Sequence, residues 1–360
     1  MNFLKKLFVA RKDVSVASFW EWFMDNEQSF YRTVKNQDNV DKNFMGKLFP
    51  QLQSLNPKFY CLTGMYDKQT VELIVTTESD IKSFVFAEEL ISAAPVLEGW
   101  RFTALTPPTG FHDANIDMDG YRFDASKIQF SVNENAAYPD EIDLVLVHSD
   151  FTETNGNVIT SGTLIYLENA LGELNRALLI DRIEIKGPSD SNQPLIPVEK
   201  LGDFLRWKEK EFVEKYDGLH YPLERENYTV LEAKDKSGRP MIAVVNQDLL
   251  NWDAKASYPW IMVIDIRYAK GNNGMPGSET ADLLNRFEDE LTLALDANDY
   301  INLGRRTYND VRTIYFACKE FRMVSKNVHQ LIGKYGPTIN ASYDIYKDKY
   351  WMTMNQYKTH

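Results

Sequence analysis

Two adjacent arginines, Arg305 and Arg306, stand just before Tyr308 in the segment GRRTY. Guanidinium groups form planar forks of N–H donors that match a carboxylate or a phosphate group. The segment therefore predicts a surface that binds a carboxylate, a phosphate or an acidic partner, with Arg305, Arg306 and Tyr308 as its binding residues. A second interpretation stays open, in which the pair braces a hairpin against Asp299, Asp310 or an acidic helix.

An acidic loop, DANIDMDG, carries Asp113, Asp117 and Asp119. Hard oxygen ligands of this kind suit divalent cations, but the loop lacks the glycine and the distal glutamate of an EF-hand. His112 precedes Asp113, and such a pair could orient an imidazole for acid–base chemistry, although adjacent side chains usually point apart. We interpret the region as a polar loop with a surface histidine. No metal site and no cofactor are expected.

The two cysteines, Cys61 and Cys318, fall in different predicted strands. A disulfide framework is therefore not expected, and a reducing compartment fits this cysteine usage. Arg312 and Lys319 would lower the pKa of the Cys318 thiol if they converged on it, but strand alternation favours a buried structural cysteine. The glycine-rich segment GNNGMPG lacks the lysine and Ser/Thr of a P-loop, and the chain has no GxSxG segment. The sequence thus contains no identifiable catalytic motif.

The arginine pair lies in a predicted hairpin. Strands are expected at residues 300–307 and 311–319, joined by Asn309-Asp310, a pair that suits a tight turn. Because side chains alternate along a strand, one of the two arginines should face the exposed side of the sheet. Three earlier strands are predicted within YTVLEAKD, MIAVVNQ and WIMVIDIRYA, as antiparallel neighbours.

Two amphipathic helices interrupt this series of strands. The first begins near Ser278, and its apolar residues recur at three- and four-residue spacing, which predicts that one side lies on the sheet. The second covers about residues 322–335 and ends at Gly336-Pro337, before an alternating strand. The predicted order β-β-β-α-β-β-α-β is that of a layered α+β sandwich with its helices on one face.

These segments carry a resemblance. WIMVIDIRYA, GNNGMP, FEDELTLAL and NLGRRTYNDVRTIYFACK resemble the uncharacterised bacterial family catalogued as domain of unknown function 695, over about a third of the chain. The element order is also similar to that of small ferredoxin-like inhibitors of ribonuclease E. The resemblance implies a fold and supplies no active site, and a shared fold does not establish a shared function.

The rest of the chain is expected to show a similar order of strands and helices. After two leading helices, the order β-β-α-β is expected twice before residue 187, with helices at residues 80–94 and 157–171. A Pro/Ser/Asn segment at residues 188–194 predicts a linker, followed by a bracing helix at residues 198–216. We therefore predict an α+β protein with two ferredoxin-like sheet-and-helix sandwich domains, mainly antiparallel. Their expected ranges are 1–187 and 227–360, with linker and bracing helix at 188–226.

The composition of the chain limits which classes of partner are expected. The 360 residues include 40 basic and 52 acidic side chains, so the net charge is -12, which disfavours nonspecific binding to nucleic acid. The opening MNFLKKLFVARKD is too short in its apolar run for a secretory signal and is interpreted as a terminal helix, with a weak interfacial helix as the alternative. No membrane span and no stable membrane association are expected. The predicted location is the cytoplasm.

Two functions follow from these observations. The preferred hypothesis is a cytosolic protein-interaction or regulatory module with a protein partner, bound by an exposed sheet face, a sheet edge or the interdomain cleft. By fold analogy the module could modulate an enzyme, or neutralise a basic toxin as an immunity protein does. The alternative is a hydrolase or small-ligand-binding enzyme with a site in the interdomain cleft, using His112, Asp113, Asp117 and Arg305 or Arg306.

Overall fold

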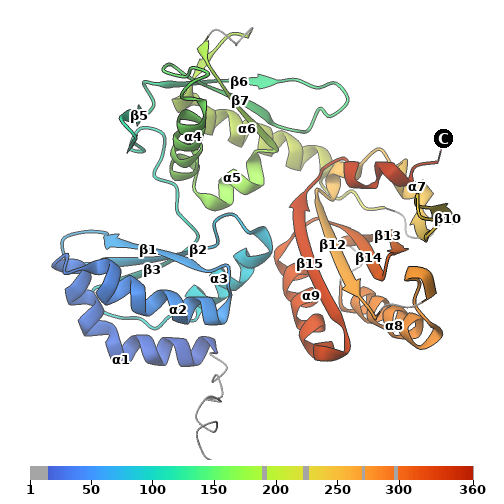
Figure 1. Ribbon diagram of the computed structural model, residues 1–360. Coiled ribbons are helices and arrows are strands. Elements are labelled where there is room, and N and C mark those ends of the chain that lie inside the picture. Colours follow the sequence, from blue (N-terminus) through green and yellow to red (C-terminus); the bar gives the residue numbers. More distant parts are fainter. Residues whose placement is uncertain (1–14, 189–192, 222–226, 270–271, 296–298, 360) are drawn as a thin grey trace, which may run out of the picture. The chain divides into compact units, whose positions relative to one another are not determined.

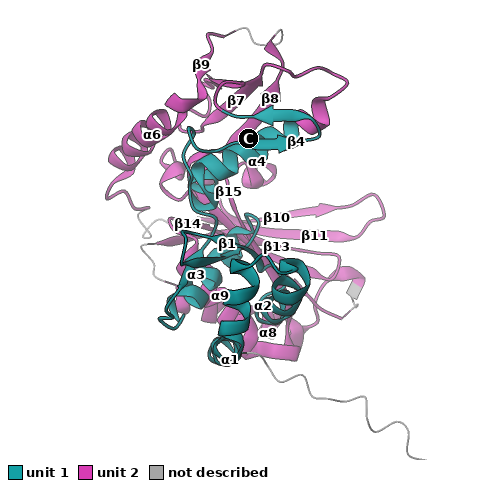
Figure 2. Ribbon diagram, turned by 90° about the vertical axis from the view of Figure 1, so that its left-hand side faces the viewer, with its two compact units in different colours: residues 1–124, 160–178 teal, residues 125–159, 179–360 magenta. Residues whose placement is uncertain are grey.

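The chain forms two compact units, and one of them is discontinuous in sequence. The computed structural model describes residues 15–188, 193–221, 227–269, 272–295 and 299–359. Unit 1 comprises residues 1–124 and 160–178, and unit 2 comprises residues 125–159 and 179–360 (Figure 2). The boundaries of these two units differ from the domain ranges expected from the sequence. The predicted terminal helix at the opening of the chain, and residues 189–192 of the predicted linker, lie outside the described residues.

Unit 1 is built on a three-stranded sheet covered by aromatic helices. β1 and β2 pair antiparallel, and β2 pairs parallel with β3 after the crossover through α3, which confirms the predicted β-β-α-β order. Phe19, Phe23 and Phe30 of α1 are fully buried, since they lie on one side of that helix. The elements are α1 Val16–Lys35, η1 Asp41–Met45, α2 Gly46–Leu55, β1 Tyr60–Met65, β2 Val71–Thr76, η2 Ile81–Ser83, α3 Phe84–Ser92, β3 Trp100–Ala104, β4 Ile116–Met118, β5 Tyr121–Phe123, α4 Gly156–Leu171 and α5 Glu173–Leu179.

Unit 2 begins with a four-stranded sheet in the order β8-β7-β6-β9. β6 pairs antiparallel with β7 and β9, whereas β7 and β8 are parallel. The second predicted β-β-α-β series is therefore confirmed, with α4 as the helix between β7 and β8. The elements are β6 Ile128–Asn133, β7 Asp143–His148, β8 Arg182–Lys186, β9 Ile196–Pro197, η4 Val198–Lys200 and α6 Leu201–Tyr216.

The second sheet of unit 2 has six strands, all antiparallel, in the order β10-β11-β13-β14-β12-β15. The prediction that the first three strands are neighbours is wrong for β12, which lies between β14 and β15. Ile261, Ile264 and Ile266 of β12 are all buried, as suits an interior strand with both faces covered. The strands are β10 Tyr228–Lys234, β11 Pro240–Asn246, β12 Trp260–Arg267, β13 Tyr300–Tyr308, β14 Val311–Cys318 and β15 Asn340–Lys347.

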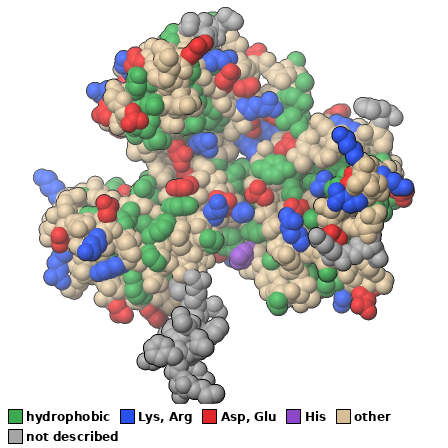
Figure 3. Space-filling model, in the orientation of Figure 1, with side chains coloured by type: hydrophobic (Ala, Val, Ile, Leu, Met, Phe, Trp, Pro, Cys, Tyr) green, Lys and Arg blue, Asp and Glu red, His purple; other side chains and the backbone are tan. Residues whose placement is uncertain are grey.

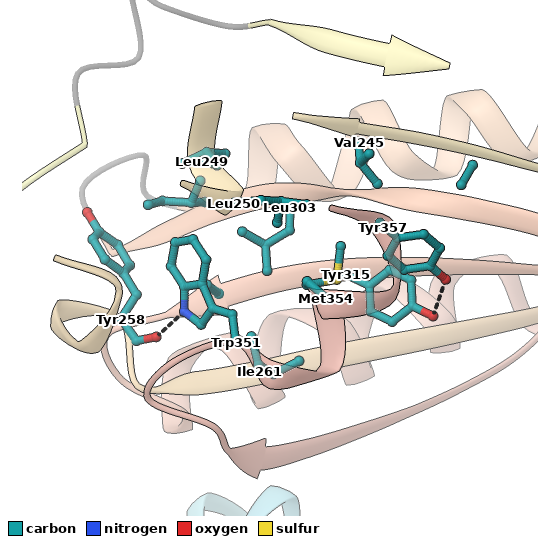
Figure 4. Packing of buried hydrophobic residues seen from close by; sticks show 13 residues of the cluster. Val245, Leu249, Leu250, Tyr258, Ile261, Leu303, Tyr315, Trp351, Met354 and Tyr357 are labelled. Atoms are coloured by element: carbon teal, nitrogen blue, oxygen red, sulfur yellow. Dashed lines mark hydrogen bonds between the residues drawn. The ribbon is translucent and has the colours of Figure 1, made fainter. Parts of the chain in front are cut away.

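The two faces of this six-stranded sheet are covered differently. α8 and α9 lie on one face, as the sequence predicts, and bury Leu284, Phe287 and Val328 (Figure 1). The C-terminal segment η8 lies on part of the opposite face, where Trp351, Met354 and neighbouring residues form a hydrophobic cluster (Figure 4). The remaining elements are α7 Gln247–Leu250, η5 Lys255–Ser257, η6 Asn272–Gly274, α8 Ser278–Ala294, α9 Arg322–Tyr335, η7 Gly336–Thr338 and η8 Met352–Tyr357.

The protein is thus α+β, with antiparallel and mixed sheets. The expectation of mainly antiparallel pairing holds with two exceptions, the parallel pairs β2/β3 and β7/β8. In the described ranges, no helix combines the length and the hydropathy that a bilayer span requires.

Candidate functional site

The β13–β14 hairpin carries the residues predicted to bind a partner. Its turn residues Asn309 and Asp310 have φ angles of 52° and 64°, so both adopt the left-handed conformation that a type I′ turn requires. Asn and Asp tolerate this conformation better than most residues. The predicted tight turn is confirmed, and it fixes the register of the strands that hold Arg305, Arg306 and Tyr308.

A β-bulge in β13 precedes the arginine pair. The register with β14 shifts between Asn302 and Gly304, and the Asn302 side chain accepts a hydrogen bond of 2.8 Å from the Gly304 amide. Gly304 has a φ of 134°, and a Cβ atom there would lie 2.3 Å from the Val244 carbonyl oxygen. Only glycine fits this close approach, and the bulge re-aims the residues that follow.

Arg305 points toward the face covered by helices. Its Nη1 lies 2.8 Å from Oε2 of Glu288 on α8, and the Glu288 side chain is only 10% exposed, whereas the Arg305 side chain is 33% exposed. Asn302 donates a longer hydrogen bond of 3.4 Å to the same carboxylate. A small cavity of about 250 Å³ adjoins the pair, with Tyr228 and Val244 in its wall. Arg305 therefore has an acidic partner within its own fold.

A second arginine of this face, Arg312, is buried. It donates hydrogen bonds to Asn285 Oδ1 at 2.7 Å and to Thr307 Oγ1 at 3.4 Å. Burial lowers the pKa of Arg312, the positive charge of Arg305 lowers it further, and Glu288 opposes both effects. The residues beneath α8 thus form a polar network that braces the hairpin, in the manner of the second interpretation of the sequence.

Tyr308 lies at the end of the hairpin and connects it to the neighbouring β10–β11 turn. Its hydroxyl donates to Asp235 Oδ2 at 2.9 Å, and Arg239 joins the two turns by donating to Asp235 at 2.8 Å and to Asn309 at 2.6 Å. Hydrogen bonds, first of all from Ser237, hold the pKa of the Asp235 carboxyl well below its usual range. The hydrogen bond to Asp235 raises the pKa of Tyr308.

Arg306 points to the opposite face of the sheet. Its register partner Ala243 belongs to the hydrophobic cluster on that face, so Arg306 lies beside the cluster and opposite α8. The register confirms that the two arginines point to opposite faces, and Arg306 is half-buried on the face away from α8 and α9. The residue next along that face of β13 is Tyr308, which is paired in register with Met241 and Val311. Val311 is in turn paired with Arg267 of β12.

We call the surface formed by Arg306, Tyr308, Met241, Val311 and Arg267 the arginine face. Arg267 is exposed and the other four side chains are half-buried. In the part of the chain that the structure describes, no carboxylate oxygen lies within 4 Å of a guanidinium nitrogen of Arg306 or Arg267. Two cations without acidic partners therefore flank an apolar and aromatic centre.

One end of the arginine face is bounded by the C-terminal segment. The hydroxyls of Tyr357 and Tyr315 lie 3.3 Å apart (Figure 4). Burial, followed by the hydrogen bond to Tyr315, raises the pKa of Tyr357, whereas the nearby Arg306 guanidinium opposes the increase. Asp265, on the same side of β12, accepts a hydrogen bond of 2.7 Å from Thr313.

The other residues singled out in the sequence lie elsewhere. His112, Asp113, Asp117 and Asp119 are exposed in unit 1, and the described residues contain no group of three His, Cys, Asp or Glu side chains that could hold a metal ion. Cys61 and Cys318 are free and buried. Burial raises the pKa of Cys61 to about 11 and raises that of Cys318 as well, so both thiols have the structural character expected of them.

Sequence reasoning missed one buried carboxylate in unit 1. Glu173 is fully buried at the start of α5 and accepts hydrogen bonds from the Thr76 hydroxyl at 2.7 Å, from the Ser79 amide at 2.9 Å and from the Thr106 amide at 3.1 Å. Thr77 donates to it through both its amide and its hydroxyl. The donors lie more than 60 residues away in sequence, so no local pattern indicates the site. Its hydrogen bonds stay within the protein, which indicates a structural role.

Comparisons with known proteins give one result. Residues 234–357 match the family described as "Family of unknown function (DUF695)". This range holds β11 to η8 and therefore the whole arginine face. No curated protein and no solved structure matches the chain at a significant level.

Proposed function

We propose that this protein is a protein-interaction or regulatory module that binds an acidic segment of a partner protein on its arginine face. The observation that supports the proposal is the contrast in pairing: Arg305 is bound to Glu288, whereas Arg306 and Arg267 have no acidic partner among the described residues. Guanidinium groups recognise carboxylates through two parallel hydrogen bonds, and arginine is enriched at protein interfaces.

The surroundings of the two cations favour a protein ligand. Tyr308 and Val311 lie between Arg306 and Arg267, and Met241 lies on the other side of Tyr308. Apolar and aromatic side chains next to arginines are the usual composition of an interaction surface. The chain as a whole carries a charge of -12, and Figure 3 shows basic and acidic side chains scattered among one another over the visible face. A nucleic acid would require a broader basic field, so a short acidic segment is the better ligand.

The fold is compatible with a regulatory role. Within the six-stranded sheet, β12-α8-β13-β14-α9-β15 pair in the order β15-β12-β14-β13, which supports a ferredoxin-like unit extended by β10 and β11. Small ferredoxin-like proteins include inhibitors of ribonuclease E, so modulation of an enzyme is one form of this function by analogy of fold. We place the module in the cytoplasm, because its two thiols are free and a reducing compartment keeps them so.

The experiment is cross-linking and affinity purification from the native cells, followed by titration of the captured protein. The double variant Arg306→Glu/Arg267→Glu should lose that protein and weaken its binding more than tenfold, because both guanidinium contacts become repulsive. Arg286→Glu is the matched control, since Arg286 is an exposed arginine of α8 on the opposite side of the sheet. The proposal is refuted if the double variant and the control bind alike, or if binding is insensitive to salt.

The alternative function is an enzyme with a site between the domains, and it stays a prediction. Its residues His112, Asp113 and Asp117 belong to unit 1, whereas Arg305 and Arg306 belong to unit 2. Of these five, Arg305 is engaged with Glu288 within unit 2. A metabolite screen with His112→Ala as the comparison tests this alternative directly.

A further inference from the structure

The outermost strand of the six-stranded sheet, β10, has an unusually plain edge. It pairs with β11 alone among the described strands, over seven residues in continuous register, with no proline and no bulge. Val230 is 59% exposed and Tyr228 is 40% exposed. Proteins commonly protect edge strands by shortening or bulging them, and β9, at the edge of the neighbouring sheet, has only two residues. Within the described residues, β10 is therefore open to pairing with a further strand.

The phase of the β10–β11 ladder shows which backbone groups face this edge. The Gln247 amide donates to the Asn227 carbonyl at 3.1 Å, and the Asp235 amide donates to the Arg239 carbonyl at 3.0 Å, at the two ends of the same register. Hydrogen-bonded pairs alternate along an antiparallel ladder, so the odd-numbered residues of β10 bond to β11. The even-numbered residues, Val230, Glu232 and Lys234 among them, present their N–H and C=O groups outward.

We propose that the partner of this edge is a second copy of the chain, paired antiparallel with β10 about Ala233, so that residues 232–234 at the C-terminal end of each β10 strand overlap. In this register Glu232 of each copy lies directly opposite Lys234 of the other, and these outward-facing residues exchange backbone hydrogen bonds. The pairing is symmetric, as a two-fold dimer requires. The small Ala233 lies at the two-fold axis, where the strands approach closely.

Charge selects this register among its neighbours. A shift to an axis at Glu232 sets Glu232 opposite its own copy, and directly opposed like charges destabilise a strand pair. An axis at Leu231 sets Glu232 opposite Val230 and leaves both charges of the strand without an opposite charge. Only the axis at Ala233 pairs each of the two charged residues with its opposite. Ala233 and Tyr308 face the same side of the sheet, so the dimer would set two arginine faces on one continuous surface.

A charge exchange tests the dimer and its register. Sedimentation velocity should show a dimer whose population grows with protein concentration. Glu232→Lys or Lys234→Glu alone should weaken association about tenfold, because each creates two like-charge pairs, and the double variant Glu232→Lys/Lys234→Glu should restore it. A monomer at every concentration overturns the proposal and leaves the edge to another protein. Equal behaviour of the single and double variants overturns it as well.

Cysteine cross-linking gives an independent readout. Ala233→Cys should form a disulfide-linked dimer under mild oxidation, because residues opposite each other in a non-hydrogen-bonded pair lie within disulfide range. Val230→Cys is the control, since Val230 is well exposed yet does not face its own copy. The native cysteines are buried and do not interfere. Equal cross-linking of the two variants refutes the register. Glu232→Pro removes an outward N–H and should abolish the dimer while the β10–β11 ladder stays intact.

Discussion

The two faces of the six-stranded sheet treat neighbouring arginines in opposite ways. On the face beneath α8, Arg305 is held at 2.8 Å from Glu288 and Arg312 is buried with Asn285 as its partner. On the opposite face, Arg306 has no carboxylate partner in the described chain, and neither has Arg267. One peptide bond separates Arg305 from Arg306, so the difference comes from strand alternation and from the element that covers each side.

The element that covers each face of the sheet decides whether an arginine there needs an internal partner. A helix that removes an arginine from water must supply an acceptor, because an unpaired buried charge is strongly destabilising. On the opposite face Arg306 is half-buried and Arg267 is exposed, so water reaches both cations and no internal carboxylate is required. The same residue type is therefore structural on one side of β13 and a binding candidate on the other.

The largest loss of stability is expected at Trp351, in the hydrophobic cluster on the face opposite α8 and α9. Trp351 is 1% exposed, packs in the hydrophobic cluster and donates from its indole nitrogen to the Tyr258 carbonyl at 3.0 Å. Trp351→Ala should lower the free energy of unfolding by about 3–5 kcal/mol, because it opens a cavity and orphans that carbonyl. Urea denaturation followed by circular dichroism measures the loss, and Trp351→Phe should lose less. An equal loss in both variants would show that the indole hydrogen bond dominates.

Another charged side chain that is nearly removed from water is Lys347, at the end of β15, which lies next to Asp181. Burial lowers the pKa of Lys347 from 10.5 to about 8, and Asp181 opposes part of this shift. Between these two pH values the unfolded chain binds more protons than the folded one, so stability should rise with pH from about 8 to 10.5. The rise is on the order of 3 kcal/mol.

Lys347→Met should remove this rise, and Asp181 keeps its ion pair with Lys349 at 2.8 Å in the variant. Chemical denaturation at several pH values measures both proteins. The difference between them isolates Lys347 from Lys255, whose pKa burial also lowers to about 8. Parallel curves for the two proteins would rule out a charged, desolvated Lys347.

Breaking the Glu288–Arg305 pair tests the contrast itself. Glu288→Ala should cost about 2 kcal/mol of unfolding free energy, less than a fully buried pair, because the Arg305 side chain is one-third exposed. Glu288→Gln keeps the shape and should cost less than Glu288→Ala. A neutral Glu288→Ala would show that the Glu288–Arg305 pair contributes nothing to stability and that the pairing of Arg305 does not distinguish the two faces.

The smallest effect on stability is expected for Arg306 of the arginine face. Arg306→Ala should change the free energy of unfolding by less than about 0.5 kcal/mol, because no ion pair is lost. The same variant should weaken partner binding, which separates recognition from folding. Thermal unfolding beside the binding titration gives both values, and a loss of stability as large as that of Glu288→Ala would make Arg306 a structural residue.

Much of the sheet around the arginine pair could be predicted. The Asn309-Asp310 turn, the amphipathic α8 and α9 and the β-β-α-β orders follow from local patterns, because turn conformation and side-chain periodicity are properties of short segments. Alternation also predicted that Arg305 and Arg306 point to different faces. The identity of the face that each arginine takes was beyond prediction, since it depends on the bulge at Gly304 and on the helix that lies opposite.

Other features depend on contacts far apart in sequence. The position of β12 between β14 and β15 follows from strand pairing between residues that are 44 or more positions apart, and it has no local signal. Glu173 shows the same limit, because the groups that donate hydrogen bonds to its carboxylate are amides and hydroxyls of the distant residues Thr76, Thr77, Ser79 and Thr106. A glutamate next to a glycine gives no indication of such a site.

The discontinuity of unit 1 has a consequence for the newly made chain. Residues 160–178 complete that unit, and Glu173 supplies the anion that the amides of Ser79 and Thr106 require. During synthesis, unit 1 is therefore incomplete when its first 124 residues leave the ribosome. It can be completed only after residues 125–159 of unit 2 and then residues 160–178 have been made. A chain truncated after residue 124 would lack Glu173, the acceptor of the Ser79 and Thr106 amides. Ribosome-stalled chains released before and after residue 178 would differ sharply in resistance to protease.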